Sequence, residues 1–142
     1  MVTYRYNKTK QSLIGGQKMK MIKRMDEYDM KEAFSDFGRD YYSLNGYRAI
    51  LDYYNDIDEN IELDVIAICC EWTEYGDNAA CDFEDMKNDY GYLYPIDEYM
   101  QDYYITEEDF DIDEYIDELI KVLECHTTVL KVSNGNYLVA LF

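Results

Sequence analysis

The stretch TTVLKVSNGNYLVALF (127–142) decides the fold class. Two runs rich in β-branched and aromatic residues, 127–132 and 136–142, flank the tripeptide Ser133-Asn134-Gly135. An Asn-Gly pair between two such runs is a strong signal for a β-hairpin, because both residues tolerate positive φ. The sequence therefore predicts two paired antiparallel strands here.

A second β-rich stretch, IELDVIAICCEW (61–72), is almost continuously apolar. This pattern is typical of a strand that is buried on both faces. We expect it to lie beside the hairpin in one small sheet. The adjacent Cys69 and Cys70 inside this run are expected to be buried thiols.

Helical spacing of apolar residues marks much of the remaining chain. The segments 25–37 and 46–54 fit helices, with Gly38 as a stop after the first. Residues 83–90 fit a short helix, and Pro95 marks the next boundary. These segments alternate with loops that contain Gly, Asn and Asp.

The clearest amphipathic helix follows a capping box formed by Thr106 and Asp109. Its apolar positions recur at three- and four-residue steps: Ile112, Tyr115, Ile116, Leu119, Ile120 and Leu123. In sum, the sequence predicts an α+β fold, with four to five helices packed on a small, mainly antiparallel sheet that ends in a C-terminal β-hairpin.

Charge divides the chain unevenly. Residues 1–24 carry seven Lys/Arg and no acid, whereas residues 25–142 carry all 31 Asp/Glu and six Lys/Arg. We expect a flexible basic N-terminal extension over 1–24 and a single acidic α+β domain over 25–142. The net charge of −18 opposes binding of the acidic body to nucleic acid or to an anionic membrane, and favours a basic protein partner.

Composition indicates a folded cytoplasmic protein. The chain is 48% hydrophobic and 16% aromatic, which argues against disorder. No stretch approaches 18 consecutive apolar residues, and no apolar signal-peptide core is present near the N-terminus. Because Cys69 and Cys70 are expected to be buried thiols, we expect the protein in a reducing cytoplasm.

Metal binding finds little support in the sequence. Asp109-x-Asp111-x-Asp113 and Asp56-x-Asp58-x-Asn60 match the first ligands of a calcium loop. However, Glu114 and Ile61 stand where that loop needs Gly, and Ile120 and Ala67 stand where it needs Glu. The soft ligands Cys69, Cys70, Cys81, Cys125 and His126 lack a zinc-site spacing, so we expect no metal and no cofactor.

Catalytic signatures are equally weak. Cys125 and His126 are sequence neighbours, and neighbouring side chains entering a strand do not face each other as a nucleophile and base must. No phosphate-binding glycine loop and no serine-nucleophile motif occurs. We therefore expect a protein that is not an enzyme.

The acidic tract DEYMQDYYITEEDFDIDEYIDEL (97–119) is the remaining feature. It holds eleven Asp/Glu and no Lys or Arg. If mostly helical it would span about 35 Å at roughly 1.5 Å per residue, or about one charge per 3 Å, close to the ~3.4 Å charge spacing of one DNA strand.

This density predicts a nucleic-acid mimic whose carboxylates occupy phosphate sites on a basic partner. Tyr99, Tyr103, Tyr104 and Tyr115 would add flat contacts between the charges. The expected partner-binding residues are Asp97, Glu98, Tyr99, Asp102, Tyr103, Tyr104, Glu107, Glu108, Asp109, Asp111, Asp113, Glu114, Asp117 and Glu118.

A family resemblance points the same way. IELDVIAICCEWTEY (61–75), GYRAILDYYNDID (46–58) and TTVLKVSNGNYLVALF (127–142) resemble a group of small acidic proteins of phages and mobile elements, over residues 25–142. The resemblance implies a phage or plasmid origin, and such elements commonly encode acidic anti-CRISPR and antirestriction inhibitors. It implies no catalytic residue or cofactor. The acidic tract is longer than is typical of the group, and the basic extension departs from it.

The sequence thus favours an inhibitor of a host defence nuclease, such as a CRISPR effector nuclease or a restriction enzyme, that acts in the host cytoplasm. Two alternatives stay open. One is a phage protein that binds a host regulator or assembly factor through a Tyr-rich face. The other is a cation-responsive binding module that uses the Asp-x-Asp loops.

Overall fold

A computed structural model describes residues 25–58 and 61–142 and shows the predicted α+β fold. Its elements are α1 (Glu27–Asp36), α2 (Leu44–Ile57), α3 (Val65–Glu71), β1 (Trp72–Tyr75), α4 (Phe83–Tyr90), α5 (Ile96–Asp102), the 3₁₀ helix η2 (Glu107–Asp109), α6 (Ile112–Leu123), β2 (Val129–Lys131) and β3 (Tyr137–Ala140). The described part contains six α-helices, slightly more than expected. The basic extension predicted over 1–24 lies outside the described residues, as does Asn60 of one Asp-rich loop.

The sheet has three antiparallel strands in the order β1-β3-β2. The C-terminal hairpin is confirmed: Val129 lies opposite Val139, and Gly135 takes a φ of +92° in the turn between β2 and β3. Strand β1 pairs with the other edge of β3, with Tyr75 opposite Tyr137. The C-terminal strand β3 is therefore the centre of the sheet.

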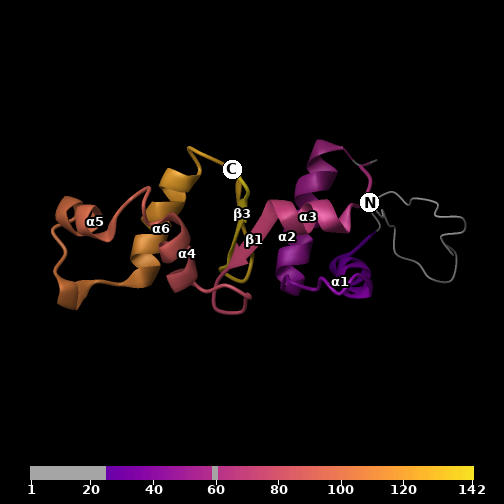
Figure 1. Cartoon of the computed structure of the whole chain (residues 1–142), viewed down its shortest axis with the longest axis horizontal. Helices are drawn as coiled ribbons and strands as arrows, with labels where there is room; N and C mark the ends of the chain where they lie inside the picture. Colours follow the sequence, from indigo (N-terminus) through magenta and orange to yellow (C-terminus); the bar gives the residue numbers. More distant parts are fainter. Residues whose placement is uncertain (1–24, 59–60) are drawn as a thin grey trace, which may run out of the picture.

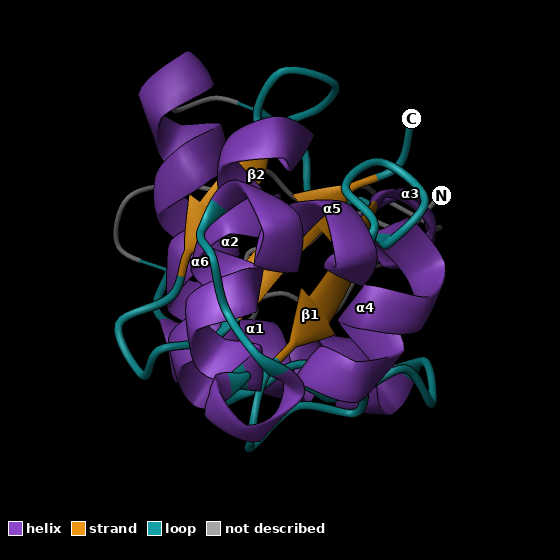
Figure 2. Cartoon of the chain, turned by 90° about the vertical axis from the view of Figure 1, so that its left-hand side faces the viewer, coloured by secondary structure: helices purple, strands orange, loops and turns teal. Residues whose placement is uncertain are grey.

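Helices cover both faces of this small sheet (Figure 1). Leu138 and Ala140 of β3 join a core with α1, α2 and α3, whereas Val139 joins a second core with α4, α5 and α6. Seen from the side of α5, the strands lie behind the second group of helices (Figure 2). Because side chains alternate along a strand, β3 supplies both cores at once.

The expectation of a buried strand over 61–72 is wrong, since most of this run forms α3. The Asp64 carboxylate accepts a hydrogen bond from the Ala67 backbone N–H at 3.1 Å and so caps a helix. Val65 and Ile68 are buried three residues apart on one face. Cys70 is exposed and Cys69 only partly buried, so the expectation of buried thiols was also wrong.

The acidic tract is not one continuous helix. It folds into α5 and α6, joined by a loop that contains η2, so the 35 Å charge-spacing estimate does not apply. Thr106 donates a hydrogen bond to Asp109 at 3.1 Å, but this pair begins η2, and Asp111 caps α6 instead. The apolar face predicted for α6 is confirmed, with Tyr115, Ile116, Leu119, Ile120 and Leu123 buried.

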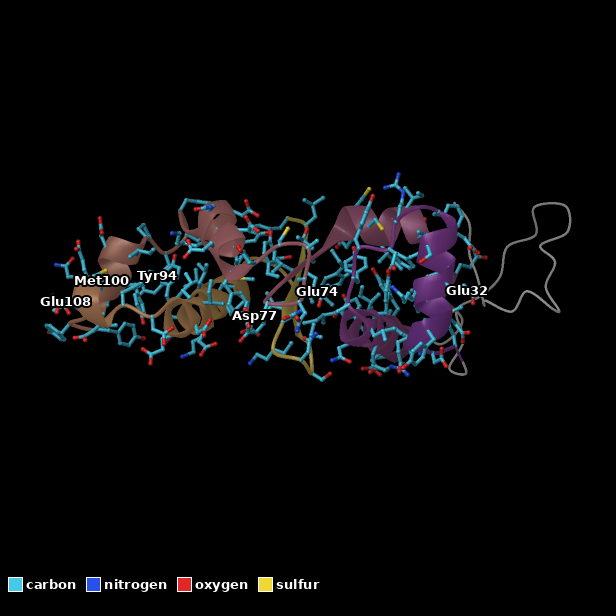
Figure 3. All side chains as sticks on the ribbon, turned by 90° about the horizontal axis from the view of Figure 1, so that it is seen from below. Glu32, Glu74, Asp77, Tyr94, Met100 and Glu108 are labelled. Atoms are coloured by element: carbon cyan, nitrogen blue, oxygen red, sulfur yellow. The ribbon has the colours of Figure 1, made fainter. Side chains whose placement is uncertain are left out.

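A buried carboxylate ties the first core to the sheet. Glu74 of β1 is 3% exposed and lies at the middle of the molecule (Figure 3). Its oxygens accept hydrogen bonds from the backbone N–H and hydroxyl of Ser43, at 2.8 and 2.6 Å, and from the Asn136 side chain at 2.8 Å. A Cβ on Gly46 would lie 2.5 Å from Glu74 Oε1, so only glycine permits this approach. Glu74 thus joins the start of α2 to the hairpin.

We expect Glu74→Ala to lower the free energy of unfolding by about 2 kcal/mol or more, because it leaves buried donors on Ser43 and Asn136 without acceptors. Urea denaturation followed by circular dichroism measures the change. The matched control is Glu71→Ala, which removes an exposed carboxylate three residues away. Equal effects of the two substitutions would contradict a structural role for the Glu74 network.

Candidate partner-binding surface

The helices on one face of the sheet carry most of the unbalanced charge. This acidic lobe, residues 82–124, contains sixteen Asp/Glu and only two lysines. Both lysines pair within their own helix, Lys87 with Glu84 at 2.7 Å and Lys121 with Glu118 at 3.0 Å. The lobe extends to Glu108 at the end of the molecule opposite Glu32 of α1 (Figure 3).

Half of these acids lie where short helices need negative charge. They cap or occupy the first turns of the three helices: Asp82, Glu84 and Asp85 in α4, Asp97 and Glu98 in α5, and Asp111, Asp113 and Glu114 in α6. A carboxylate there accepts hydrogen bonds from free backbone N–H groups or offsets the positive end of the helix dipole. This part of the acidic charge therefore stabilises the fold.

Tyrosine hydroxyls hold several of the other carboxylates. Hydroxyl–carboxylate hydrogen bonds of 2.8–3.1 Å join Tyr75 to Asp89, Tyr94 to Asp102, Tyr103 to Glu118 and Tyr137 to Asp117. A hydroxyl orders a carboxylate as an ammonium group would, but adds no positive charge. The lobe therefore presents fixed carboxylates while remaining strongly negative.

These contacts shift the pKa of the groups involved. Burial, followed by hydrogen bonding to Asp102 or Asp117, raises the pKa of Tyr94 and Tyr137. The hydrogen bond to Glu118 raises the pKa of Tyr103, and Lys121 is the main cause that lowers the pKa of Glu118 itself. At neutral pH the hydroxyls remain protonated donors.

The segments before and after α5 expose aromatic side chains. Tyr104 is 95% exposed, Tyr92 70% and Tyr103 51%. The carboxylates of Glu107 and Glu108 in η2 are exposed and have no hydrogen-bond or ion-pair partner in the part of the chain that the structure describes. Flat rings beside free carboxylates are suited to contact a basic protein surface.

Tyr104 is held in a conformation that normally belongs to glycine. Its φ is +55°, the only positive φ of a non-glycine residue within 25–58 and 61–142. The Ile105 N–H donates to the Met100 carbonyl at 2.8 Å, which closes α5 as a Schellman motif with Tyr104 at the left-handed position. In α1 the equivalent position is Gly38, with a φ of +67°. Tyrosine there costs about 1 kcal/mol, and its ring gains no burial.

A groove of about 460 Å³ separates α5 from α6. Its apolar lining comes from Tyr99, Tyr103 and Ile105, and its charged rim from Glu114, Asp117, Glu118 and Lys121. Three carboxylates against one ammonium leave the rim negative. The groove can therefore receive the stem and cationic head of an Arg or Lys side chain from a partner.

The structure exposes most of the residues predicted to bind a partner. Asp97, Glu98, Asp102, Tyr103, Tyr104, Glu107, Glu108, Asp109, Asp111, Asp113, Glu114 and Asp117 are exposed, and Glu118 is half-buried. The expectation of surface contacts was wrong for Tyr99 and Tyr115, which are 3% and 0% exposed and pack inward from α5 and α6. Tyr92 was missed, although its position between Gly91 and Pro95 signals a surface turn.

Neither a metal site nor a membrane-spanning helix occurs in the described residues. Over 25–58 and 61–142, no three His, Cys, Asp or Glu side chains gather closely enough to hold a metal ion. Asp109, Asp111 and Asp113 are divided between η2, the cap of α6 and its first turn. No helix in these ranges combines the length and apolar character that crossing a bilayer requires.

The tyrosine pKa values predict how stability depends on alkaline pH. A pKa raised above the unfolded value of about 10 stabilises the folded state below that pH, and the contribution is lost as pH rises further. We therefore expect the melting temperature to fall steeply above about pH 10, together with a cooperative rise in phenolate absorbance. Ionisation of the buried tyrosines Tyr42, Tyr47 and Tyr75 near pH 10, in a chain that keeps its folded circular dichroism, would contradict this expectation.

The backbone of Tyr104 predicts an unusual stabilising substitution. We expect Tyr104→Gly to raise the free energy of unfolding by about 0.5–1 kcal/mol, because glycine relieves the left-handed strain. The control is Tyr92→Gly, an exposed tyrosine with negative φ, which should not stabilise the protein. Urea denaturation measures both variants, and a destabilised Tyr104→Gly protein would mean that the ring stabilises the fold.

Comparison of the chain with protein-family models, with curated proteins and with solved structures finds no match in any of the three.

Proposed function

We propose that the protein is an inhibitor of phage or mobile-element origin that acts in the host cytoplasm. It binds a defence nuclease without catalysing a reaction, and its acidic lobe occupies a groove that otherwise holds nucleic acid. A CRISPR effector nuclease is the preferred target class, and restriction enzymes come next. The observation that carries this proposal is the set of ordered carboxylates in the acidic lobe, which among the residues that the structure describes form ion pairs only with Lys87 and Lys121.

Order matters as much as charge in this proposal. A flexible acidic side chain loses conformational entropy when it enters a phosphate site, and this loss weakens binding. Helix N-termini and tyrosine hydroxyls already fix many of the lobe's carboxylates, such as Asp102 and Asp117. Effector nucleases hold their duplex and displaced strand in basic channels. A preorganised acidic surface is suited to such a channel.

The aromatic end of the lobe supports a specific protein contact. Tyrosine supplies a large contact area at a low entropy cost. Tyr104 is fully exposed in a strained conformation, and residues kept under strain cluster at functional sites. In the proposed complex Tyr104 packs on the rim of the basic channel, while an Arg or Lys of the target enters the groove between α5 and α6.

The exposed tyrosines also favour a second candidate. Tyr92, Tyr103 and Tyr104 could form the centre of an interface with a host regulator or assembly factor that binds no nucleic acid. The two functions differ in one measurable respect. DNA competes with the protein for a nuclease channel, but does not compete for a regulator of this kind.

A competition experiment tests the proposed function. Guide-loaded CRISPR effector nucleases and restriction enzymes are incubated with labelled target duplex and increasing amounts of the protein. We expect displacement of the duplex from a susceptible nuclease, and an inhibition constant that weakens roughly tenfold or more between about 50 and 200 mM salt. Inhibition that is independent of salt, or binding that leaves the duplex in place, would exclude nucleic-acid mimicry.

Matched variants locate the binding surface. The variant Tyr104→Ala/Glu107→Gln/Glu108→Gln removes one exposed ring and two charges from the end of the lobe. The control Tyr28→Ala/Glu71→Gln/Asp77→Asn removes the same groups from exposed positions outside it. We expect the first variant to lose most of its inhibition and the control to retain it. Equal losses would show that net charge alone accounts for binding.

A further inference from the structure

Strand β2 leaves one side of its backbone open. The Ala140 N–H donates to the Thr128 carbonyl at 3.0 Å, and the Val132 N–H donates to the Asn136 carbonyl at 2.8 Å. In an antiparallel pair such bonds recur at every second residue, so the N–H and C=O groups of Val129 and Lys131 point away from β3. These groups have no hydrogen-bond partner within residues 25–58 and 61–142.

A groove follows this open edge. It has a volume of about 430 Å³ and lies between α2 and the end of α6. Asp52, Tyr53 and Asp56 line it from α2, and Glu124 lines it from the residue that follows α6. Leu130 packs toward the first core and Val129 toward the second, so the groove exposes the strand between the two helical layers.

The walls of the groove are acidic. The carboxylates of Asp56 and Glu124 have no ion-pair or hydrogen-bond partner among the described residues. The Asp52 carboxylate forms an ion pair with Arg48 at 3.2 Å. Lys131 is the single cation in the lining. A short edge strand carrying lysine is a common protection against self-association. Here the acidic walls and the net charge of −18 also repel a second copy of this chain.

From this combination we propose that the edge of β2 binds an extended, cationic segment of a partner protein, which adds to the sheet as a fourth strand. The outward N–H and C=O groups of Val129 and Lys131 pair with the backbone of the segment. Its side chains alternate between the two walls, so Arg or Lys residues at every second position face Asp52 and Asp56. This site shares only Glu124 with the acidic lobe and includes no residue of α5 or η2, so it does not depend on the function proposed above.

The test uses a labelled eight-residue peptide that alternates Arg and Thr, and a second peptide in which Glu replaces Arg. Fluorescence anisotropy measures binding to the full chain, and hydrogen exchange followed by NMR measures protection of the Val129 and Lys131 amides. We expect the arginine peptide alone to bind and to slow exchange at both amides. Arginine-peptide binding with no protection at these amides would overturn the proposal.

Two sets of variants complete the test. Val129→Pro removes the outward N–H and leaves the inward bonds of β2 intact, and Val129→Ala is its matched control. We expect the proline variant to bind the arginine peptide roughly tenfold more weakly than the alanine variant. Asp56→Asn/Glu124→Gln should weaken binding several-fold, whereas Glu107→Gln/Glu108→Gln in the acidic lobe should not.

The variants distinguish strand addition at β2 from binding elsewhere on the protein. Equal binding by the proline and alanine variants would exclude strand addition. If only Glu107→Gln/Glu108→Gln weakens binding, the peptide binds at the η2 end of the acidic lobe, and this result would exclude the groove. If Val129→Pro fails to fold by circular dichroism, Lys131→Pro replaces it, and amide protection in the unsubstituted protein then distinguishes strand addition from binding elsewhere.

Discussion

The structure depends on the two-sided role of β3. A sheet of three strands, each only three or four residues long, has to bury side chains on both faces. Leu138 faces one core and Val139 the other, so a shift of one residue in strand pairing would exchange the two cores. Glu74 opposes such a shift, because it binds Asn136 beside the hairpin turn and Ser43 at the start of α2. The register of the sheet and the docking of the first helical layer are therefore fixed by the same carboxylate.

Self-repulsion is the second constraint on this fold. A chain with a net charge of −18 has too few cations to pair its acids, and charge of this size opposes the compact state. The fold places much of the charge where it is least costly, at helix N-termini and beside tyrosine hydroxyls such as those of Tyr94 and Tyr103. The ring of Tyr94 also packs against the rings of Tyr99 and Tyr115. Tyrosine hydroxyls therefore supply hydrogen bonds to carboxylates for which the chain has too few cations.

Sequence patterns predicted the elements whose signal is local and repeated. The hairpin at Asn134-Gly135 and the apolar face of α6 are confirmed, because turn chemistry and periodicity over several turns leave few alternatives. The prediction of a strand over 61–72 was wrong. Its β-branched residues suggest a strand, whereas the Asp64 cap and burial in the first core produce a helix. Tyr99 was misplaced because α5 has seven residues, too few for periodicity to show its inward face. The left-handed backbone of Tyr104 depends on how α5 ends, which the residue type does not reveal.

Charge and strain differ in how strongly they indicate function. Half of the acids in the acidic lobe already serve helix termini, so the total charge overstates the surface available to a partner. Tyr104 has no such structural role: its ring is exposed, and its backbone takes the left-handed conformation that glycine adopts at Gly38, the equivalent position after α1. A residue that costs stability and contributes no packing is better explained by an external contact than by the fold. For this reason we propose a partner surface centred on the end of α5 and on η2, rather than one spread evenly over every carboxylate of the lobe.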